Sequence, residues 1–264
     1  MTTLEQAEAL ARGAGELLSR HYGRLRRADA SRKEGVRRDL VSAADLDAER
    51  SIVAGIPAAD DILGEEGARR DRGADRCWVV DPLDGTVNFL HGIPYWCVSI
   101  GVVEGGALAG GVVHAPELGE TFTVEAGGGA RLNGEPIRVS PTADLRDAML
   151  ATGLAYRRNE LPDHNLDNIQ TLAMACADLR RLGAAALDLA WVACGRLDGF
   201  WELHLNPWDV AAGILLVREA GGEVTDFRGA RGVHALLHGG HLLASNGRIH
   251  EAIRGRLAPL RGLP

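Results

Sequence analysis

The sequence predicts a layered α/β fold, because apolar patterns typical of helices and of strands alternate along the chain. Residues 3–22 and 43–56 carry apolar side chains at helical spacing. Residues 97–125 form short β-rich runs that Gly-containing turns separate. With 264 residues, of which 46% are hydrophobic, the chain has enough apolar material for a folded core.

The N-terminal segment predicts two helices with a charged loop between them. In residues 3–22, Leu4, Leu10 and Leu17 belong to an apolar stripe at helical spacing. Residues 24–39 are crowded with charge and have little periodicity, which predicts an exposed loop. The helix over 43–56 is expected to end at Pro57.

Short apolar runs that end in acidic residues follow these helices. Residues 62–63 lead to Glu65, and residues 78–80 lead to Asp81, so we expect two buried strands with carboxylates at their ends. Residues 97–125 predict a meander of three antiparallel strands, which residues 127–139 extend.

The second half of the chain predicts alternating strands and helices. Strands are expected at 147–152, 197–202, 223–225 and 241–245, and helices at 162–176, 184–194, 209–220 and 248–256. We place a domain boundary at 140–150, which gives an N-terminal part, 1–145, and a C-terminal part, 146–264. The two parts are expected to pack tightly and to act as one unit.

Charge and cysteine content exclude several classes of protein. The net charge is -7, with 36 acidic and 29 basic residues, which argues against general nucleic-acid binding. No run approaches 18 apolar residues and the first residues do not resemble a signal peptide, so no membrane attachment or export is expected. Four cysteines without a CxxC pair predict reduced thiols and a cytoplasmic location.

The segment Asp81-Pro82-Leu83-Asp84-Gly85-Thr86 is the most informative in the chain. Two carboxylates, a Pro and a Gly predict a tight turn after a strand, with the backbone carbonyl of Leu83 between the acids. Hard cations such as Mg²⁺ bind oxygen clusters of this kind, and Thr86 adds a hydroxyl at the rim. The alternative is an ordinary solvated Asp-Gly turn.

Three other acids have functional and ordinary interpretations. Glu65 is either a ligand at a strand end or part of a solvated Glu-Glu pair, and Asp209 is either a ligand or a helix cap. Asp45 fits the first turn of a helix. Taken together, several carboxylates at the ends of apolar elements are typical of a cation site, because a bound cation relieves their repulsion. The sequence leaves open whether they meet.

His234, His238 and His241 have the spacing of a conceivable zinc site, but no cysteine accompanies them. They lie in a Gly-rich stretch, so we predict solvated loop histidines there.

Two long motifs make the chain recognisable. DPLDGTVNFLHGIP at 81–94 and WDVAAGILLVREAGG at 208–222 resemble the two signature motifs of the inositol monophosphatase family, in the style of its bacterial members. DLVSAAD at 39–45, GEE at 64–66 and RRLGAAALDLAWVACGRLDGFWE at 180–202 also match, in the family order. The resemblance covers nearly the whole chain.

The resemblance implies a five-layered α-β-α-β-α sandwich of the sugar-phosphatase type, a homodimer, and lithium-sensitive hydrolysis of a phosphate monoester with two or three Mg²⁺ ions. By position, it implies that the metal ligands are Glu65, Asp81, the Leu83 carbonyl, Asp84 and Asp209. It further implies that Asp45 and Thr86 orient the attacking water, with Glu65 beside them as the third catalytic residue.

The same resemblance implies a set of substrate contacts: Asp84, Gly85, Thr86, Arg180, Gly183, Ala184, Glu202 and Asp209. Ala184 stands where relatives often carry Thr or Ser, so one side-chain hydroxyl is missing. The loop before Asp39 is expected to form a flap over the metals. Relatives often place a Lys four or five residues before this Asp, whereas Lys33 lies six residues before it, and the sequence leaves open which of Lys33, Arg37 and Arg38 acts in the flap.

The first functional hypothesis is a phosphatase for myo-inositol 1-phosphate, a small phosphorylated polyol. The carboxylate of Glu202 favours a polyol, because it accepts hydrogen bonds from two neighbouring hydroxyls. The alternatives are the same chemistry on fructose 1,6-bisphosphate, 3′-phosphoadenosine phosphates, histidinol phosphate or NADP, or a regulatory binding protein that retains the phosphatase fold.

Overall fold

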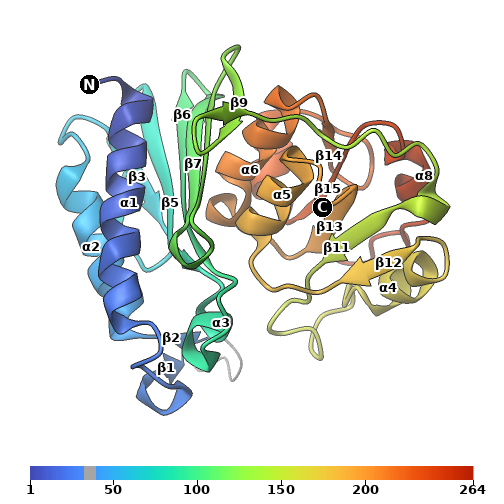
Figure 1. Cartoon of the computed structure of the whole chain (residues 1–264), viewed down its shortest axis with the longest axis horizontal. Coiled ribbons are helices and arrows are strands. Elements are labelled where there is room, and N and C mark those ends of the chain that lie inside the picture. Colours follow the sequence, from blue (N-terminus) through green and yellow to red (C-terminus); the bar gives the residue numbers. More distant parts are fainter. Residues whose placement is uncertain (33–39, 264) are drawn as a thin grey trace.

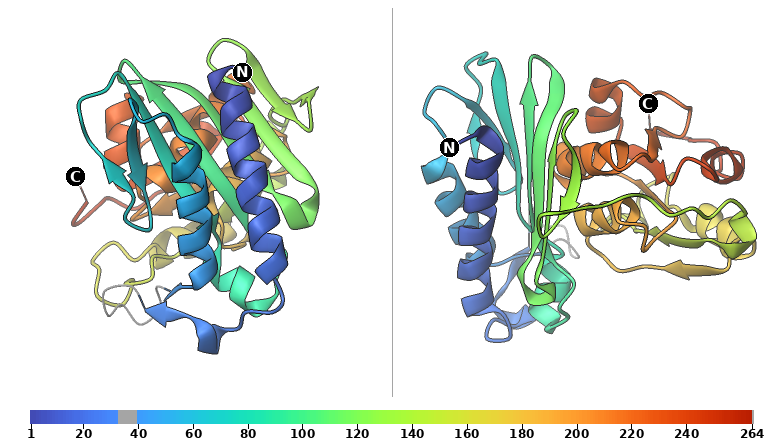
Figure 2. Two further views of the ribbon diagram at one scale, coloured as in Figure 1. Left: turned by 90° about the vertical axis from the view of Figure 1, so that its left-hand side faces the viewer. Right: turned by 45° about the horizontal axis from the view of Figure 1, so that its top comes forward.

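The computed structural model describes residues 1–32 and 40–263, which form five layers (Figure 1). The predicted α-β-α-β-α sandwich is thereby confirmed. From one side to the other, the layers are a helix pair, a large sheet, a second helix pair, a smaller sheet and an outer helix layer, as Figure 2 also shows. The helix layers are α1 (Thr3–His21) with α2 (Ala43–Gly55), α5 (Ala185–Ala193) with α6 (Pro207–Glu219), and α4 (Leu166–Ala173) with α8 (His250–Arg254).

The large sheet has eight strands in the order β10-β9-β8-β7-β6-β5-β3-β4, and only β3 and β5 are parallel neighbours among them. The strands are β3 (Asp61–Gly64), β4 (Arg69–Arg70), β5 (Arg76–Asp84), β6 (Cys97–Glu104), β7 (Ala107–Ala115), β8 (Glu120–Glu125), β9 (Gly129–Leu132) and β10 (Glu135–Pro136). Strands β6 to β8 are the predicted antiparallel meander, and β9 and β10 extend it.

The smaller sheet has five strands in the order β12-β11-β13-β15-β14. They are β11 (Met149–Thr152), β12 (Asp178–Arg180), β13 (Gly199–Leu203), β14 (Glu223–Thr225) and β15 (His241–Ser245). Strand β11 is parallel to β12 and β13, whereas β15 is antiparallel to β13 and β14. Strand β12 was not expected, because its sequence is short and mostly charged.

The described chain also contains several short elements. Strands β1 (Ser31–Arg32) and β2 (Leu40–Val41) pair antiparallel beside the 3₁₀ turn η1 (Arg27–Asp29), and α3 (Thr86–His91) and α7 (Val233–His238) are helices of six residues. The segment 24–39 was expected to be an exposed loop, but its described part contains η1 and β1. Lys33, Arg37 and Arg38 lie outside the described residues.

Three apolar clusters hold the layers together. One packs α1 and α2 against the large sheet around Trp78 and Trp96, and another packs the smaller sheet against α4 and α8 around Trp201. The third and largest joins the two sheets through α5 and α6. Burial of these faces is the main favourable term for the fold.

Helix α6 lies directly on the large sheet because glycines on the strands leave room for it. A Cβ atom at Gly101 on β6 would lie 2.6 Å from the Cβ atom of Ala211, and one at Gly111 on β7 would lie 3.0 Å from Ala212. Side chains at these positions would force the helix away from the sheet. The glycines therefore set the distance between α6 and the strands. They also set the position of Asp209, which lies in the first turn of α6.

The histidines do not form the predicted solvated loop. His234 and His238 lie on α7 with ring centroids 4.8 Å apart, and His241 is buried in β15, where Nδ1 accepts a hydrogen bond from the backbone N–H of Phe227. His234 and His238 are exposed, as predicted, but the predicted loop was wrong, because the stretch supplies a short helix and an inner strand in which His241 is buried. No helix in the described part is long and apolar enough to cross a membrane.

His114 should make stability depend on pH. Its ring packs against Gly15 of α1 and lies 2.9 Å from Thr121 Oγ1, and burial lowers its pKa from 6.5 to about 4. The unfolded chain therefore binds a proton between these values that the folded protein does not accept. The free energy of unfolding should fall by about 3 kcal/mol as the pH falls from 6.5 to 4.

Urea unfolding of the wild type and His114→Gln at several pH values measures this effect. The other titrating groups act in both proteins, so the difference between the two curves isolates the imidazole. Parallel curves would show that His114 does not set this pH dependence.

Candidate active site

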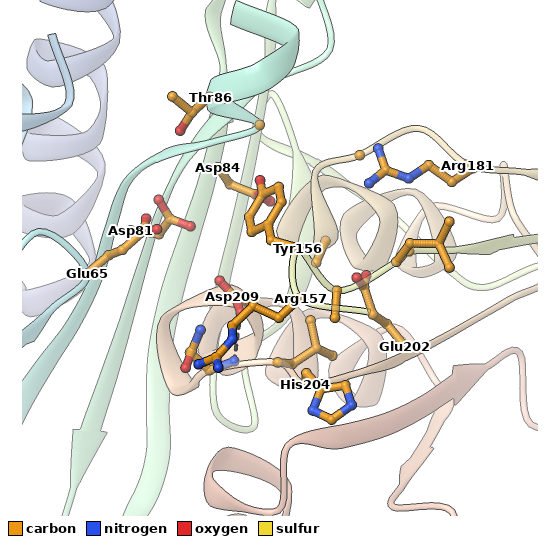
Figure 3. Close-up of a pocket in the computed structure, with 18 of the residues that line it drawn as sticks. Glu65, Asp81, Asp84, Thr86, Tyr156, Arg157, Arg181, Glu202, His204 and Asp209 are labelled. Atoms are coloured by element: carbon orange, nitrogen blue, oxygen red, sulfur yellow. Dashed lines mark hydrogen bonds between the residues drawn. The ribbon is translucent and has the colours of Figure 1, made fainter. Parts of the chain in front are cut away.

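A cavity of about 330 Å³ opens between the two sheets, and both halves of the chain line it (Figure 3). Among the residues that line it, the following were predicted from the sequence: Glu65, Asp81, Leu83, Asp84, Gly85, Thr86, Gly183, Glu202 and Asp209. Segments far apart in the sequence thus meet at one place, which the sequence alone left open.

The turn after β5 gives the cavity its first wall. The register of β5 against β6 shifts between Asp81 and Asp84, and the backbone N–H of Leu83 donates to Asp81 Oδ1 at 3.0 Å. The side chain of Leu83 is buried and anchors the turn, while Gly85 has a φ of 94°. A Cβ atom at Gly85 would also lie 3.0 Å from the carbonyl oxygen of Tyr95, so the turn requires glycine.

Helix α5 fixes Asp84 from the other half of the chain. The backbone N–H of Ala186 in its first turn donates to Asp84 Oδ2 at 2.7 Å. Backbone N–H groups at a helix start favour a negative charge. The bond therefore orients one carboxylate oxygen of Asp84 towards α5 and ties the smaller part of the fold to the turn.

Asp45 and Thr86 form a buried pair at the rim of this turn. The hydroxyl of Thr86 lies 3.0 Å from Asp45 Oδ1 and 3.2 Å from the Leu83 carbonyl oxygen, so it donates to one of two acceptors. Asp45 Oδ2 accepts from both the backbone N–H and the hydroxyl of Ser42, at 2.9 and 2.6 Å. Asp45 is thus a first-turn helix residue, as the ordinary interpretation had it, and also a partner of Thr86.

Asp209 combines the two interpretations that the sequence offered. It is the third residue of α6, and its Oδ2 accepts the backbone N–H of Asn206 at 2.7 Å as part of a capping box. The same side chain also lines the cavity. Asp209 therefore caps the helix and also supplies a carboxylate to the cavity.

Glu65 and Asp81 lie together on the wall formed by β3 and β5 (Figure 3). The backbone N–H of Glu65 donates to the carbonyl of Val80 at 3.1 Å, which continues the pairing of the two parallel strands. Its neighbour Glu66 is held differently, because its backbone N–H donates to Glu49 Oε1 at 2.9 Å. Of the two adjacent acids, only Glu65 lines the cavity.

The cavity carboxylates raise one another's pKa values. Burial, and then the charges of Glu65, Asp84 and Asp209, hold the pKa of Asp81 well above its usual range. Burial raises the pKa of Asp84 to about 7, against the hydrogen bond from Ala186. A group of acids that repel one another in a dry site fits a bound cation, which would lower the energy of the ionised forms.

The donor set suits Mg²⁺. Carboxylate oxygens and the Leu83 carbonyl are hard oxygen ligands around one cavity. Within residues 1–32 and 40–263, no three His, Cys, Asp or Glu side chains are grouped closely enough to hold a metal by themselves. Water and phosphate oxygens would complete the coordination shell, which is the usual arrangement for Mg²⁺ in proteins.

The far end of the cavity belongs to the smaller sheet. Glu202 on β13 lines it, and a Cβ atom at Gly153 would lie 2.0 Å from its carboxylate, so this glycine makes room for the acid. Burial and the charge of Asp188 hold the pKa of Glu202 well above its usual range. Gly183 lines the same end, whereas Ala184 is buried and is not part of the lining.

Arg180 was predicted to contact substrate, but the structure places it outside the cavity. Its guanidinium pairs with Asp178 at 2.6 Å on the edge strand β12, and its neighbour Arg181 lines the cavity instead. Successive side chains of an extended chain point to opposite sides, so a shift of one residue exchanges the two arginines.

Several lining residues carry no signal in the sequence. Tyr156, Arg157, His204 and Asn206 come from loops after strands of the smaller sheet. Only their position after strand ends could have indicated them.

Comparison with known proteins places the chain in a family. The model of the inositol monophosphatase family matches residues 1–260. A protein named Nus factor SuhB from Pseudomonas aeruginosa is 44% identical over 257 residues, covering 94% of this chain and 93% of the relative. A fructose-1,6-bisphosphatase/inositol-1-monophosphatase from Thermotoga maritima is 40% identical over 256 residues, covering 96% and 94%.

A solved structure shows the same fold. The inositol monophosphatase from Anabaena (Nostoc) superposes with a TM-score of 0.85 at 38% identity, covering 97% of this chain and 96% of the other. The sequence motifs, the family model over residues 1–260 and the fold all point to the same family. This protein is therefore a member of the inositol monophosphatase family.

Proposed function

We propose that the protein is a Mg²⁺-dependent phosphate monoester hydrolase that acts on myo-inositol 1-phosphate. The observation that carries the proposal is the gathering of Glu65, Asp81, Asp84 and Asp209 around one cavity. Relatives named as inositol monophosphatases, and one named also as a fructose-1,6-bisphosphatase, support the reaction class.

In this proposal Glu65, Asp81, the Leu83 carbonyl, Asp84 and Asp209 hold two or three Mg²⁺ ions. When bound, the ions supply the positive charge that a phosphate monoester and its leaving oxygen need during hydrolysis. The protein's own contribution is to fix the carboxylates: the N–H of Leu83 orients Asp81, that of Ala186 orients Asp84 and that of Asn206 orients Asp209.

Thr86 and Asp45 are proposed to orient the attacking water. When Thr86 Oγ1 donates its proton to Asp45, its lone pairs accept a hydrogen from the water. The two donors from Ser42 keep the other oxygen of Asp45 occupied, so the aspartate does not turn away. Glu65, which lines the cavity together with Thr86, is proposed as a further acceptor for the water.

The substrate is proposed to lie between the turn and β13. Backbone N–H groups at Gly85 and Thr86 hold phosphate oxygens, and Asp84 and Asp209 face the ester. Glu202 accepts hydrogen bonds from the polyol hydroxyls at the far end, beside Gly183. The side chain of Ala184 is buried, so we propose that only its backbone contacts the substrate.

The proposal extends to the state of the protein in solution. We propose a homodimer that lithium inhibits, as the family resemblance implies. Both parts, 1–145 and 146–264, supply lining residues, so we propose that they act as one unit. All four cysteines are free thiols in the structure, which favours a reducing compartment such as the cytoplasm.

The test is phosphate release from myo-inositol 1-phosphate in excess Mg²⁺, with EDTA as the control. Fast release with Mg²⁺ and none with EDTA is the expected result. Folded protein that releases no phosphate from this substrate would refute the inositol assignment, and the other small phosphates would be assayed next. The same assay with Glu202→Gln tests the polyol contact, with a rise in KM of about tenfold expected.

A regulatory binding role is the second candidate. It is favoured by the 44% identical relative from Pseudomonas aeruginosa, whose name is that of a Nus factor. The charge of -7 does not favour contact with nucleic acid in general, so a protein partner fits this chain better.

A further inference from the structure

The loop between β11 and α4, residues 153–165, lines one side of the catalytic cavity. It supplies a run of lining residues: Gly153, Leu154, Ala155, Tyr156, Arg157 and Leu161. Figure 3 shows Tyr156 and Arg157 in the same cavity as Asp84 and Asp209. The loop contains no helix or strand, and most side chains of residues 156–160 are exposed. These residues bury little surface of their own, so contacts at the ends of the loop must hold it in place.

Asn165 ties the two ends of this loop together. Its buried side chain donates through Nδ2 to the hydroxyl oxygen of Thr152 at 2.9 Å and to the carbonyl oxygen of Gly153 at 2.7 Å. Its Oδ1 accepts a hydrogen bond from Trp201 Nε1 at 2.8 Å. The amide thus bonds through both its nitrogen and its oxygen, and it closes the loop against β11 and β13.

Asp163 fastens the same end of the loop to residues 258–263, which we call the strap. The carboxylate is buried and accepts three backbone N–H groups of the strap. Oδ1 accepts from Arg261 at 2.7 Å, and Oδ2 accepts from Gly262 at 2.6 Å and from Leu263 at 3.1 Å. Hydrogen bonds to an ionised carboxylate are stronger than those between neutral groups, so this is a firm attachment.

The backbone of Asp163 reaches the cavity through His204. The Nε2 atom of His204 lies 2.7 Å from the carbonyl oxygen of Asp163, and because a carbonyl only accepts, Nε2 carries the proton. His204 lines the cavity just after Glu202, and its φ of 64° is a conformation that favours glycine. The bond to Asp163 therefore helps to fix the backbone beside the proposed polyol contact.

The strap is itself packed against the core of the smaller sheet. Leu260 and Leu263 contact the apolar cluster around Trp201. Gly262 lies against the loop, where a Cβ atom would come within 2.8 Å of Pro162 Cγ. The strap thus connects the core of the smaller sheet to the loop that lines the cavity.

We propose that Asp163 is a positioning residue for the substrate. By bonding the strap and His204, it fixes the loop 153–165 and so sets the affinity for the alcohol part of the phosphate ester. The inference rests on the proposed phosphatase function. Asp163 is not among the residues that line the cavity, so it acts through the loop and His204. Its loss should weaken substrate binding and leave the chemical step nearly unchanged.

Asp163→Asn tests this role, because asparagine keeps the shape of the side chain and removes the charge that binds the strap. KM for myo-inositol 1-phosphate should rise about tenfold, with kcat within about twofold of the wild type. Asp167→Asn is the matched control. Asp167 is exposed and pairs with Arg261 of the same strap at 3.2 Å, and a surface pair of this kind contributes little. Its KM should equal that of the wild type.

Proteolysis after glutamate measures the loop directly and needs no phosphatase activity. Glu160 is the only glutamate in residues 153–165, and the strap contains none, so cleavage at Glu160 reports on the loop while the strap stays uncut. Cleavage there, identified by fragment mass, should be at least about tenfold faster in Asp163→Asn than in the wild type or Asp167→Asn.

Gly262→Ala loosens the same attachment from the strap, because its Cβ atom would press on Pro162. It should raise both KM and the cleavage rate, and it tests the inference even where Asp163→Asn fails to fold.

The outcomes separate this inference from the phosphatase proposal. Unchanged cleavage at Glu160 in both variants would overturn the inference, because the strap would then not hold the loop. Faster cleavage at constant KM, or a fall in kcat alone, would overturn it as well and leave the phosphatase proposal intact. A wild type that hydrolyses no phosphate ester would overturn the phosphatase proposal, and the expected effect on KM with it.

Discussion

Replacing Asp84 with asparagine should reduce kcat/KM for myo-inositol 1-phosphate by at least about 10²-fold, since a metal ion contributes several kcal/mol to such a reaction. Asparagine keeps the shape and one oxygen of Asp84, so the amide can still accept the hydrogen bond from Ala186. What it loses is the negative charge at the centre of the proposed metal site. The measurement is phosphate release over a range of Mg²⁺ concentrations.

Stability distinguishes this result from simple misfolding. Burial raises the pKa of Asp84 to about 7, so the ionised carboxylate is unfavourable in the metal-free fold and asparagine should leave the melting temperature unchanged or raise it. The matched control is Asp178→Asn, which removes a carboxylate that pairs with Arg180 outside the cavity. Full turnover by Asp84→Asn would refute the proposed mechanism, and lost turnover with retained partner binding would support a separate regulatory role.

Replacing Gly101 with alanine should lower the free energy of unfolding by about 1–3 kcal/mol. The added Cβ atom would lie 2.6 Å from Ala211 Cβ and 3.2 Å from the backbone nitrogen of Ala212, and neither can move without the helix. Because α6 begins at Pro207 and carries Asp209 in its first turn, activity should fall as well. Urea unfolding and the phosphatase assay measure the two effects.

Gly13→Ala is the matched control for this variant. Gly13 lies in α1, and a Cβ atom there would meet nothing within 4 Å. Alanine in the middle of a helix should therefore stabilise the protein by about 0.5–1 kcal/mol, with no effect on activity. Equal stability changes in the two variants would show that the contact between α6 and the sheet is not tight.

The sequence predicts best those elements whose signal is local. Apolar residues at helical spacing placed α1 and α2, and alternating β-rich runs between Gly-containing turns placed the strands β6 to β8. Strand β12 was missed because its three residues, Asp178 to Arg180, become a strand only by pairing with β11. Such an edge strand forms only because it pairs with its neighbour, and its own three residues contain no pattern that predicts a strand.

The residues of the candidate site also differ in how well the sequence identifies them. The turn from Asp81 to Thr86 was identifiable because two acids and a Gly follow an apolar run, and its residues do line the cavity. Asp209 was ambiguous because a helix cap and a cavity carboxylate occupy the same position in the sequence. The choice between Arg180 and Arg181 depends on which side of an extended segment faces inward, and only the packed structure decides it.

The hydrogen bond between Ala186 and Asp84 spans 102 residues and has a consequence for protein synthesis. A ribosome releases the turn that contains Asp84 long before it adds the helix that orients this carboxylate. During that interval the acids of the first half have no opposite wall and remain in water. The chain can therefore become active only after its second half has been synthesised and has folded. Phosphatase activity would then be absent from incomplete chains.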